Sequence, residues 1–88
     1  MIQKERKQTL IEEFQVHEGD TGSSEVQIAL LTERISQLTD HLRINKHDFH
    51  NQRGLIMLVE QRRRLLKYLR ATNLKSYKSV TKKLRIRD

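Results

Sequence analysis

The sequence predicts an all-α fold of four helices, in which a long second and a long third helix form an antiparallel pair. Apolar residues recur at steps of three and four along most of the chain, which is typical of amphipathic helices. The chain has no proline and only three glycines, so helix breakers are rare. No run of alternating apolar and polar residues indicates a strand. At 88 residues, we expect one domain that spans residues 1–88.

The first helix is predicted at about Lys4–Val16, and the polar segment 18–23 ends it. Its apolar side consists of three residues at helical spacing, with Val16 as a further candidate: Leu10, Ile11 and Phe14. So few core residues, next to a loop with two glycines, predict that this helix opens more easily than the long pair.

The second helix is predicted from Ser24 to about Arg43. Its apolar stripe repeats at steps of three and four: Ile28, Leu31, Ile35, Leu38 and Leu42. Ser24 and Gln27 fit a capping box, in which Ser24 is the N-cap and the Gln27 side chain reaches back toward it. At about 1.5 Å per residue, this helix would be about 30 Å long.

The third helix is predicted to begin near Asp48 or His50 and to end near Thr72, where Thr72 and Asn73 supply a new cap. Its apolar side consists of Leu55, Leu58, Val59, Leu65, Leu66 and Leu69. The fourth helix runs from Leu74 onward, with an apolar stripe of Leu74, Tyr77, Val80 and Leu84. Short connections between the four helices predict an antiparallel bundle or hairpin whose rigid centre is the second and third helices.

Charge is separated along the chain. Residues 1–44 carry five Lys/Arg and eight Asp/Glu, a net charge of −3, whereas residues 45–88 carry thirteen and three, a net charge of +10. A basic half of this strength predicts a polyanionic partner, either nucleic acid or an anionic membrane. The apolar face of each helix is needed for the bundle, and the longest apolar run, residues 55–59, is far shorter than the roughly 20 residues of a membrane span. We therefore expect no membrane association.

Enzymatic and metal chemistry find little support in the sequence. There is no cysteine, and no motif arranges serine, histidine and aspartate as a catalytic triad. His41, His47, Asp48 and His50 are close in sequence, but their spacing matches neither two histidines on one helix face nor a zinc-finger framework. We expect neither catalysis nor a metal or other cofactor. The lack of cysteine favours a cytosol-like compartment.

Residues 61–70 are the most informative stretch. On a helix, Arg64 and Tyr68 are four residues apart and share a basic face, while leucines occupy the opposite side. The alternative for Tyr68 is a half-buried place in the core. Few aromatic residues disfavour single-stranded nucleic acid, and neither connection fits the short turn of a helix-turn-helix DNA reader well. Small polar groups beside Arg and Lys, as at Thr21, Ser24 and Gln27, suit structured RNA.

Three blocks of sequence resemble the bacterial form of ribosomal protein fifteen of the small subunit. They are residues 19–27, the pattern His41…Asp48…Asn51…Gly54-Leu55, and residues 61–69, and the likeness covers essentially the whole chain. The resemblance implies a four-helix protein with a mobile first helix. It implies binding to the central domain of 16S rRNA early in assembly, without a cofactor, and a place beside neighbouring small-subunit proteins and at a bridge to large-subunit rRNA. Several family members also repress their own mRNA.

The resemblance further implies two RNA contacts on a protein that is monomeric when free and resides on cytoplasmic or organellar ribosomes. One contact is a three-way junction, met by Thr21, Gly22, Ser24, Gln27, Arg64 and Tyr68. The other is a minor-groove step with a G·U and a G·C pair, met by His41, Asp48 and Asn51. Asn51 replaces the family's serine but can still donate and accept hydrogen bonds. The alternative function is a helical protein-interaction adaptor whose basic face meets an acidic partner.

Overall fold

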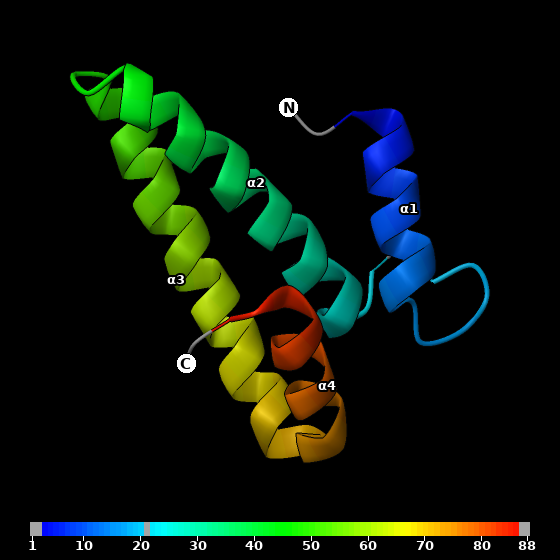
Figure 1. Cartoon of the computed structure of the whole chain (residues 1–88). Helices are drawn as coiled ribbons and strands as arrows, with labels where there is room; N and C mark the ends of the chain where they lie inside the picture. The colour runs from blue at the N-terminus through cyan, green and yellow to red at the C-terminus, as the bar shows by residue number, and fades with distance from the viewer. Residues whose placement is uncertain (1–2, 21, 87–88) are drawn as a thin grey trace.

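The computed structural model describes residues 3–20 and 22–86, and within them the chain forms four helices and no strand (Figure 1). The helices are α1 (Lys4–Phe14), α2 (Ser24–Ile44), α3 (Phe49–Thr72) and α4 (Leu74–Leu84). This confirms the predicted all-α fold and the long second and third helices. No helix in the described part of the chain combines the length and the apolar character needed to cross a bilayer.

The helices α2 and α3 run antiparallel and lie side by side from their connecting loop, and they move apart toward the start of α2 (Figure 1). The helix α1 packs on α2, and α4 folds back against the C-terminal part of α3 and also contacts α2. The molecule is elongated, with principal extents of 40 × 28 × 18 Å. The α2–α3 pair is therefore the frame, with the two short helices added near one of its ends.

The apolar core has two parts. The larger cluster draws on all four helices, and its buried members are Leu10, Ile11, Phe14, Val26, Ile28, Ala29, Leu66, Leu69 and Val80. The smaller cluster lies between α2 and α3 alone and consists of Leu31, Leu38 and Leu58. We call the part of the molecule around the larger cluster the four-helix end, and the part from residue 38 to residue 58, where α2 turns into α3, the hairpin end.

The start of α2 differs from its prediction by one residue. Ser23, not Ser24, is the N-cap: its backbone is extended and its Oγ accepts a hydrogen bond from the Val26 N–H at 3.3 Å. Ser24 is the first residue of the helix. Gln27 does reach back, but its side-chain amide donates to the Gly22 carbonyl at 2.6 Å. The N-cap is the last residue before the helix with a non-helical backbone. The loop before α2 holds Ser23, and not Ser24, in that conformation.

Two residues predicted to be apolar core residues lie in solvent. The helix α1 ends at Phe14, so Val16 falls in the following loop and is 61% exposed. Leu74 begins α4 and is separated from the end of α3 by Asn73 alone, so it stands at the corner between two helices and is 50% exposed. The remaining predicted stripe of α4 does pack inward, with Val80 buried.

The helix α1 is fixed to α2 by its three buried residues and by one ion pair, Arg6 Nη2 to Glu33 Oε2 at 3.4 Å. Both partners of this pair are partly exposed, and such pairs add little stability. The predicted mobility of α1 stays a prediction, which amide exchange can test.

Candidate nucleic-acid interface

The loop before α2 is built around Asp20, a residue that sequence analysis missed. Asp20 is only 6% exposed. Its Oδ1 accepts hydrogen bonds from the N–H groups of Gly22 at 3.0 Å and Ser23 at 2.9 Å, and its Oδ2 accepts from Val16 N–H at 3.0 Å. A signal was present in the sequence, because aspartate often accepts from N–H groups two and three residues ahead.

Hydrogen bonding by Ser23 and by the backbone N–H of Val16 holds the pKa of the Asp20 carboxyl well below its ordinary value. Gly19 supports the same loop with a φ of 82°, a backbone conformation that side chains disfavour. The carboxylate therefore stays ionised and holds the chain that leads into α2.

This loop and the start of α2 carry the first group of residues expected to contact RNA. Gly22 and Gln27 are exposed and Ser24 is partly exposed, at the helix end where free N–H groups and the helix dipole favour an anion. Their arrangement depends on Asp20 and on the hydrogen bond from Gln27 to the Gly22 carbonyl. Thr21 lies outside the described residues.

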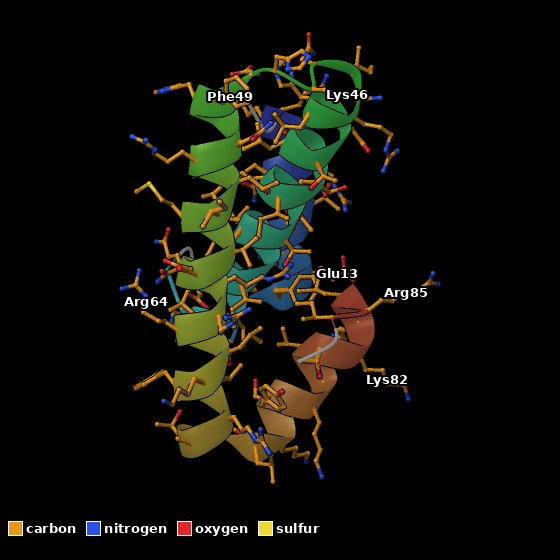
Figure 2. The ribbon with its side chains drawn as sticks, turned by 90° about the vertical axis from the view of Figure 1, so that its left-hand side faces the viewer. Glu13, Lys46, Phe49, Arg64, Lys82 and Arg85 are labelled. Atoms are coloured by element: carbon orange, nitrogen blue, oxygen red, sulfur yellow. The ribbon has the colours of Figure 1, made fainter. Side chains whose placement is uncertain are left out.

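The helix α3 supplies the second group. Arg64 and Tyr68 are both exposed, and Figure 2 shows Arg64 pointing away from the bundle. Tyr68 keeps 59% of its surface in solvent, so it is not the half-buried core residue of the alternative interpretation. The core positions of this stretch belong to Leu66 and Leu69.

The register of the hairpin places these two groups at the same end of the molecule. Arg62 Nη1 donates to Thr32 Oγ1 at 3.3 Å, and in an antiparallel pair this brings residues 64–68 of α3 level with the first turns of α2. Within residues 3–20 and 22–86, the Gln27 side chain makes its hydrogen bond to the Gly22 carbonyl and none to Arg64 or Tyr68. The two groups therefore lie at the same end of the molecule, and the side chains of Gln27, Arg64 and Tyr68 are exposed there.

At the hairpin end, the structure brings His41, Asp48 and Asn51 into one cluster. His41 Nε2 lies 2.8 Å from Asp48 Oδ2, and Asn51 Nδ2 donates to the same oxygen at 2.6 Å. Asn51 N–H donates to Asp48 Oδ1 at 3.2 Å, which makes Asp48 the N-cap of α3. The three residues expected to contact RNA at this end are therefore joined, because His41 of α2 and Asn51 of α3 both bond to the Asp48 carboxylate.

The carboxylate in this cluster is ionised at neutral pH. Hydrogen bonds from the His41 side chain and from the side chain and backbone of Asn51 lower the pKa of Asp48 from 3.8 to about 2. A carboxylate offers roughly four acceptor positions, and three are occupied here. One acceptor position is left for a donor that approaches from outside.

The His41 ring is oriented on its other side by Asn45. Asn45 Nδ2 lies 3.4 Å from His41 Nδ1 and donates to the His41 carbonyl at 3.0 Å. With Nε2–H donating to Asp48, Nδ1 is the acceptor in the neutral ring. Asn45 is a second residue that sequence analysis did not place in the site.

A hollow of about 290 Å³ lies beside the cluster, lined by Gln37, Leu38, His41 and Asn51. Gln37 Oε1 is buried in its wall and, among the described residues, has no hydrogen-bond partner. No sequence pattern marks Gln37. Within residues 3–20 and 22–86, no group of three or more His, Cys, Asp or Glu side chains could hold a metal ion.

An all-α chain with a strongly basic half and exposed polar clusters at both ends of a rigid hairpin has the features of a small helical protein that binds nucleic acid. Residues 7–87 match the model of the family described as ribosomal protein S15. The chain is 55% identical over 86 residues to the small ribosomal subunit protein uS15 of Limosilactobacillus reuteri (strain DSM 20016), which covers 98% of this chain and 97% of that protein.

It is also 56% identical over 87 residues to the small ribosomal subunit protein uS15 of Trichlorobacter lovleyi, covering 99% of each. The chain therefore belongs to the ribosomal protein S15 family, as the resemblance indicated. This is a family of structural ribosomal proteins and not of enzymes.

Proposed function

We propose that this chain is a structural protein of the small ribosomal subunit that binds the central domain of 16S rRNA through two sites on one rigid hairpin. The junction site meets a three-way RNA junction and consists of Thr21, Gly22, Ser24, Gln27, Arg64 and Tyr68. The step site meets an adjacent minor-groove step with a G·U and a G·C pair and consists of His41, Asp48 and Asn51. Binding of both nucleates early assembly of the subunit.

The observation that carries this proposal is the placement of the two sites on the same frame. Gln27 and His41 both lie on α2, fourteen residues and therefore about 20 Å apart along its axis. The helices α2 and α3 are joined by a packed core along this distance. A rigid spacing between two polar sites suits an RNA whose junction and step are themselves held at a fixed distance.

The same proposal includes the protein's further partners. The free monomer would join the ribosome in the cytoplasm or in an organelle, beside other small-subunit proteins. The exposed hairpin end would contribute to a bridge with large-subunit rRNA, and the RNA sites could also take the chain's own mRNA.

Insertion of base pairs tests the spacing. We expect tight binding to an RNA that carries the junction and the step at their natural separation. Inserting about half a turn of duplex between them rotates the step away, so affinity should fall to that of the junction alone. His41→Ala should weaken binding to the natural RNA and have no further effect on the spaced RNA. Equal affinity for both RNAs would contradict the proposal.

The adaptor alternative differs in its salt dependence. Counterion release makes the logarithm of RNA affinity fall steeply with the logarithm of salt concentration. A protein partner held by an apolar interface gives a shallow dependence. A steep slope with the junction RNA, and weaker binding to a DNA duplex of equal length, would support the proposal over the adaptor.

A further inference from the structure

The helix α4 carries a row of cations on its outer side. Lys75, Lys78 and Lys82 are spaced at three and four residues and share one face, and Arg85 follows directly after the helix. All four are exposed, and α4 contains no acidic residue. None of them takes part in an ion pair within the described residues. We call these four residues the α4 stripe.

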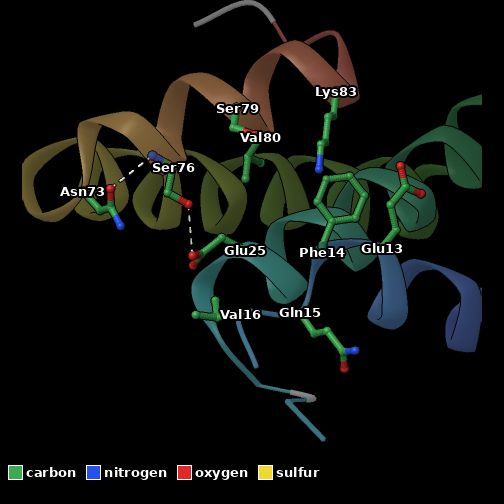
Figure 3. Close-up of a pocket in the computed structure, with 10 residues that line it drawn as sticks. All are labelled: Glu13, Phe14, Gln15, Val16, Glu25, Asn73, Ser76, Ser79, Val80 and Lys83. Carbon is green, nitrogen blue, oxygen red and sulfur yellow. Dashed lines mark hydrogen bonds between the residues drawn. The ribbon is translucent and has the colours of Figure 1, made fainter. Parts of the chain in front are cut away.

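The inner side of α4 is held firmly, which fixes the direction of the stripe. Figure 3 shows the pocket where α4 meets the end of α1 and the start of α2. There Ser76 Oγ donates to Glu25 Oε2 at 3.0 Å, and Val80 is buried. Lys83 turns the other way from the stripe, with its Nζ 5.6 Å from the centre of the Phe14 ring.

Two members of the stripe lie on the side of the molecule opposite to Arg64 of the junction site. Figure 2 shows Arg64 leaving α3 on one side of the molecule, while Lys82 and Arg85 leave on the opposite side. Both the step site and the junction site are built on the loops and helices of the α2–α3 pair. Lys82 and Arg85 therefore point away from the side on which RNA would meet Arg64, and neither proposed site includes a residue of the stripe.

We propose that the α4 stripe binds the phosphate backbone of a second RNA segment, separate from the RNA held by the junction and step sites. From Lys75 to Arg85 the stripe is about 15 Å long. A duplex carries one phosphate charge for roughly every 1.7 Å of its axis, so a stripe of this length faces several phosphates. Lysines act there as point charges that position the RNA without reading its sequence.

The chemistry of the stripe favours RNA over an acidic protein. Among the described residues of α4, Leu74 is the one large apolar side chain that is strongly exposed, at 50%, whereas protein interfaces have an apolar core. The proposal rests on the proposed function in that both take RNA as the partner. It goes beyond that function because it adds a contact on the opposite side of the molecule and lets one chain hold two RNA segments together.

The test uses a double variant and a matched control. Lys78→Gln with Lys82→Gln removes two charges from the stripe, and Lys4→Gln with Lys7→Gln removes two from α1. All four lysines are exposed and lie on helices, and glutamine has a helix propensity close to that of lysine. Circular dichroism should show unchanged helix content in both variants, so that lost binding reports on the surface.

Each protein is first saturated with the junction-and-step RNA, and a labelled RNA duplex of unrelated sequence is then titrated in. We expect the loaded wild type to bind the duplex. The stripe variant should bind it roughly tenfold more weakly at low salt, with the salt slope reduced by about 2, or about 1 per lost phosphate contact. Its affinity for the junction-and-step RNA should stay within about twofold of the wild type, and the α1 variant should match the wild type in both assays.

Three results would overturn the proposal: no duplex binding to the loaded wild type, equal losses in the stripe and α1 variants, or full RNA binding by the stripe variant. Failure of the proposed function has a different signature, since then the wild type does not bind the junction-and-step RNA. In that event the duplex is titrated into the free proteins. A larger loss in the stripe variant than in the α1 variant would still support the stripe.

Discussion

The loops at the two ends of α2 are each organised by one aspartate, but the two carboxylates are used differently. Asp20, at the four-helix end, accepts hydrogen bonds from backbone N–H groups of its own loop and is almost fully buried. Asp48, at the hairpin end, accepts from side chains on two helices as well as from the backbone, and its side chain is 28% exposed.

The two aspartates therefore have different roles: Asp20 stabilises the conformation of a loop, whereas Asp48 positions side chains at the surface. The bonds of Asp20 are directed inward and set the conformation from which Gly22 and Gln27 reach the solvent. The bonds of Asp48 orient His41 and Asn51 at the surface and leave one acceptor position open. We therefore expect changes at Asp20 to act first on stability, and changes at Asp48 to act first on RNA binding.

The largest expected effect is that of Asp20→Ala on stability. The change leaves three N–H groups of a tightly folded loop without their acceptor, so we expect the melting temperature to fall by roughly 10 °C or more. Asp40→Ala is the control, because Asp40 is exposed and pairs only with Arg43 three residues ahead. Equal melting temperatures for the two variants would show that Asp20 does not hold the loop.

Asp48→Ala tests the other half of the comparison. In a minor groove, the donor on a base edge is the guanine amino group, and a carboxylate can accept from it. If Asp48 reads this group, the change should weaken binding by roughly 5- to 150-fold. If Asp48 is only the cap of α3, the variant is more basic and should bind RNA equally well or slightly more tightly.

An RNA with inosine in place of the guanine at the step provides the control for Asp48→Ala. Inosine lacks the amino group, so the difference between wild type and variant should largely disappear on this RNA. Loss of the cap alone would lower helix stability and act equally on both RNAs. Parallel losses on the two RNAs would refute base reading by Asp48.

Amide hydrogen exchange compares the local stability of α1 with that of the α2–α3 pair. The helix α1 contributes three buried residues and a partly exposed ion pair, whereas residues 55–69 of α3 contribute buried residues to both core clusters. Amides of residues 5–15 should therefore exchange at least about tenfold faster than those of residues 55–69. Equal protection of the two segments would contradict the prediction that α1 opens independently.

Tyr68→Phe should have a smaller effect, confined to binding. Tyr68 is 59% exposed, and the ring is kept in the variant, so the melting temperature should not change. Loss of one hydrogen bond to RNA should cost about 1 kcal/mol, or roughly fivefold in affinity. Unchanged affinity with a lowered melting temperature would instead assign Tyr68 a packing role.

The smallest expected effect is the dependence of stability on pH. Folding lowers the pKa of Asp48 from 3.8 to about 2, so the folded state favours the ionised carboxylate. The stability that this adds is complete above about pH 4 and is lost as the pH falls toward 2. Between pH 4 and 2, the melting temperature of the wild type should therefore fall more steeply than that of Asp48→Asn. Parallel curves would contradict the contribution of Asp48.

The sequence by itself determined the helices and much of the candidate site. Apolar spacing identified four helices, and short-range rules identified the Asp48 and Asn73 caps, because a cap joins residues only three positions apart. The hydrogen bonds from Gly22 and Ser23 to Asp20 are equally local, so the same kind of rule could have predicted the role of Asp20. The charge of the C-terminal half indicated a polyanionic partner, and the three motif blocks indicated the family, which the comparisons then showed.

The tertiary structure alone decided which helix faces are covered and which parts of the chain meet. Apolar spacing defines a face but not what packs against it, so the exposure of Val16 and Leu74 depended on where α1 ends and α4 begins. The meeting of His41 with Asn51 depended on the register between α2 and α3, which contacts distant in sequence set. The direction of the α4 stripe likewise required the packing of α4 against α2 and α3, since helical spacing places its lysines on one face without saying where that face points.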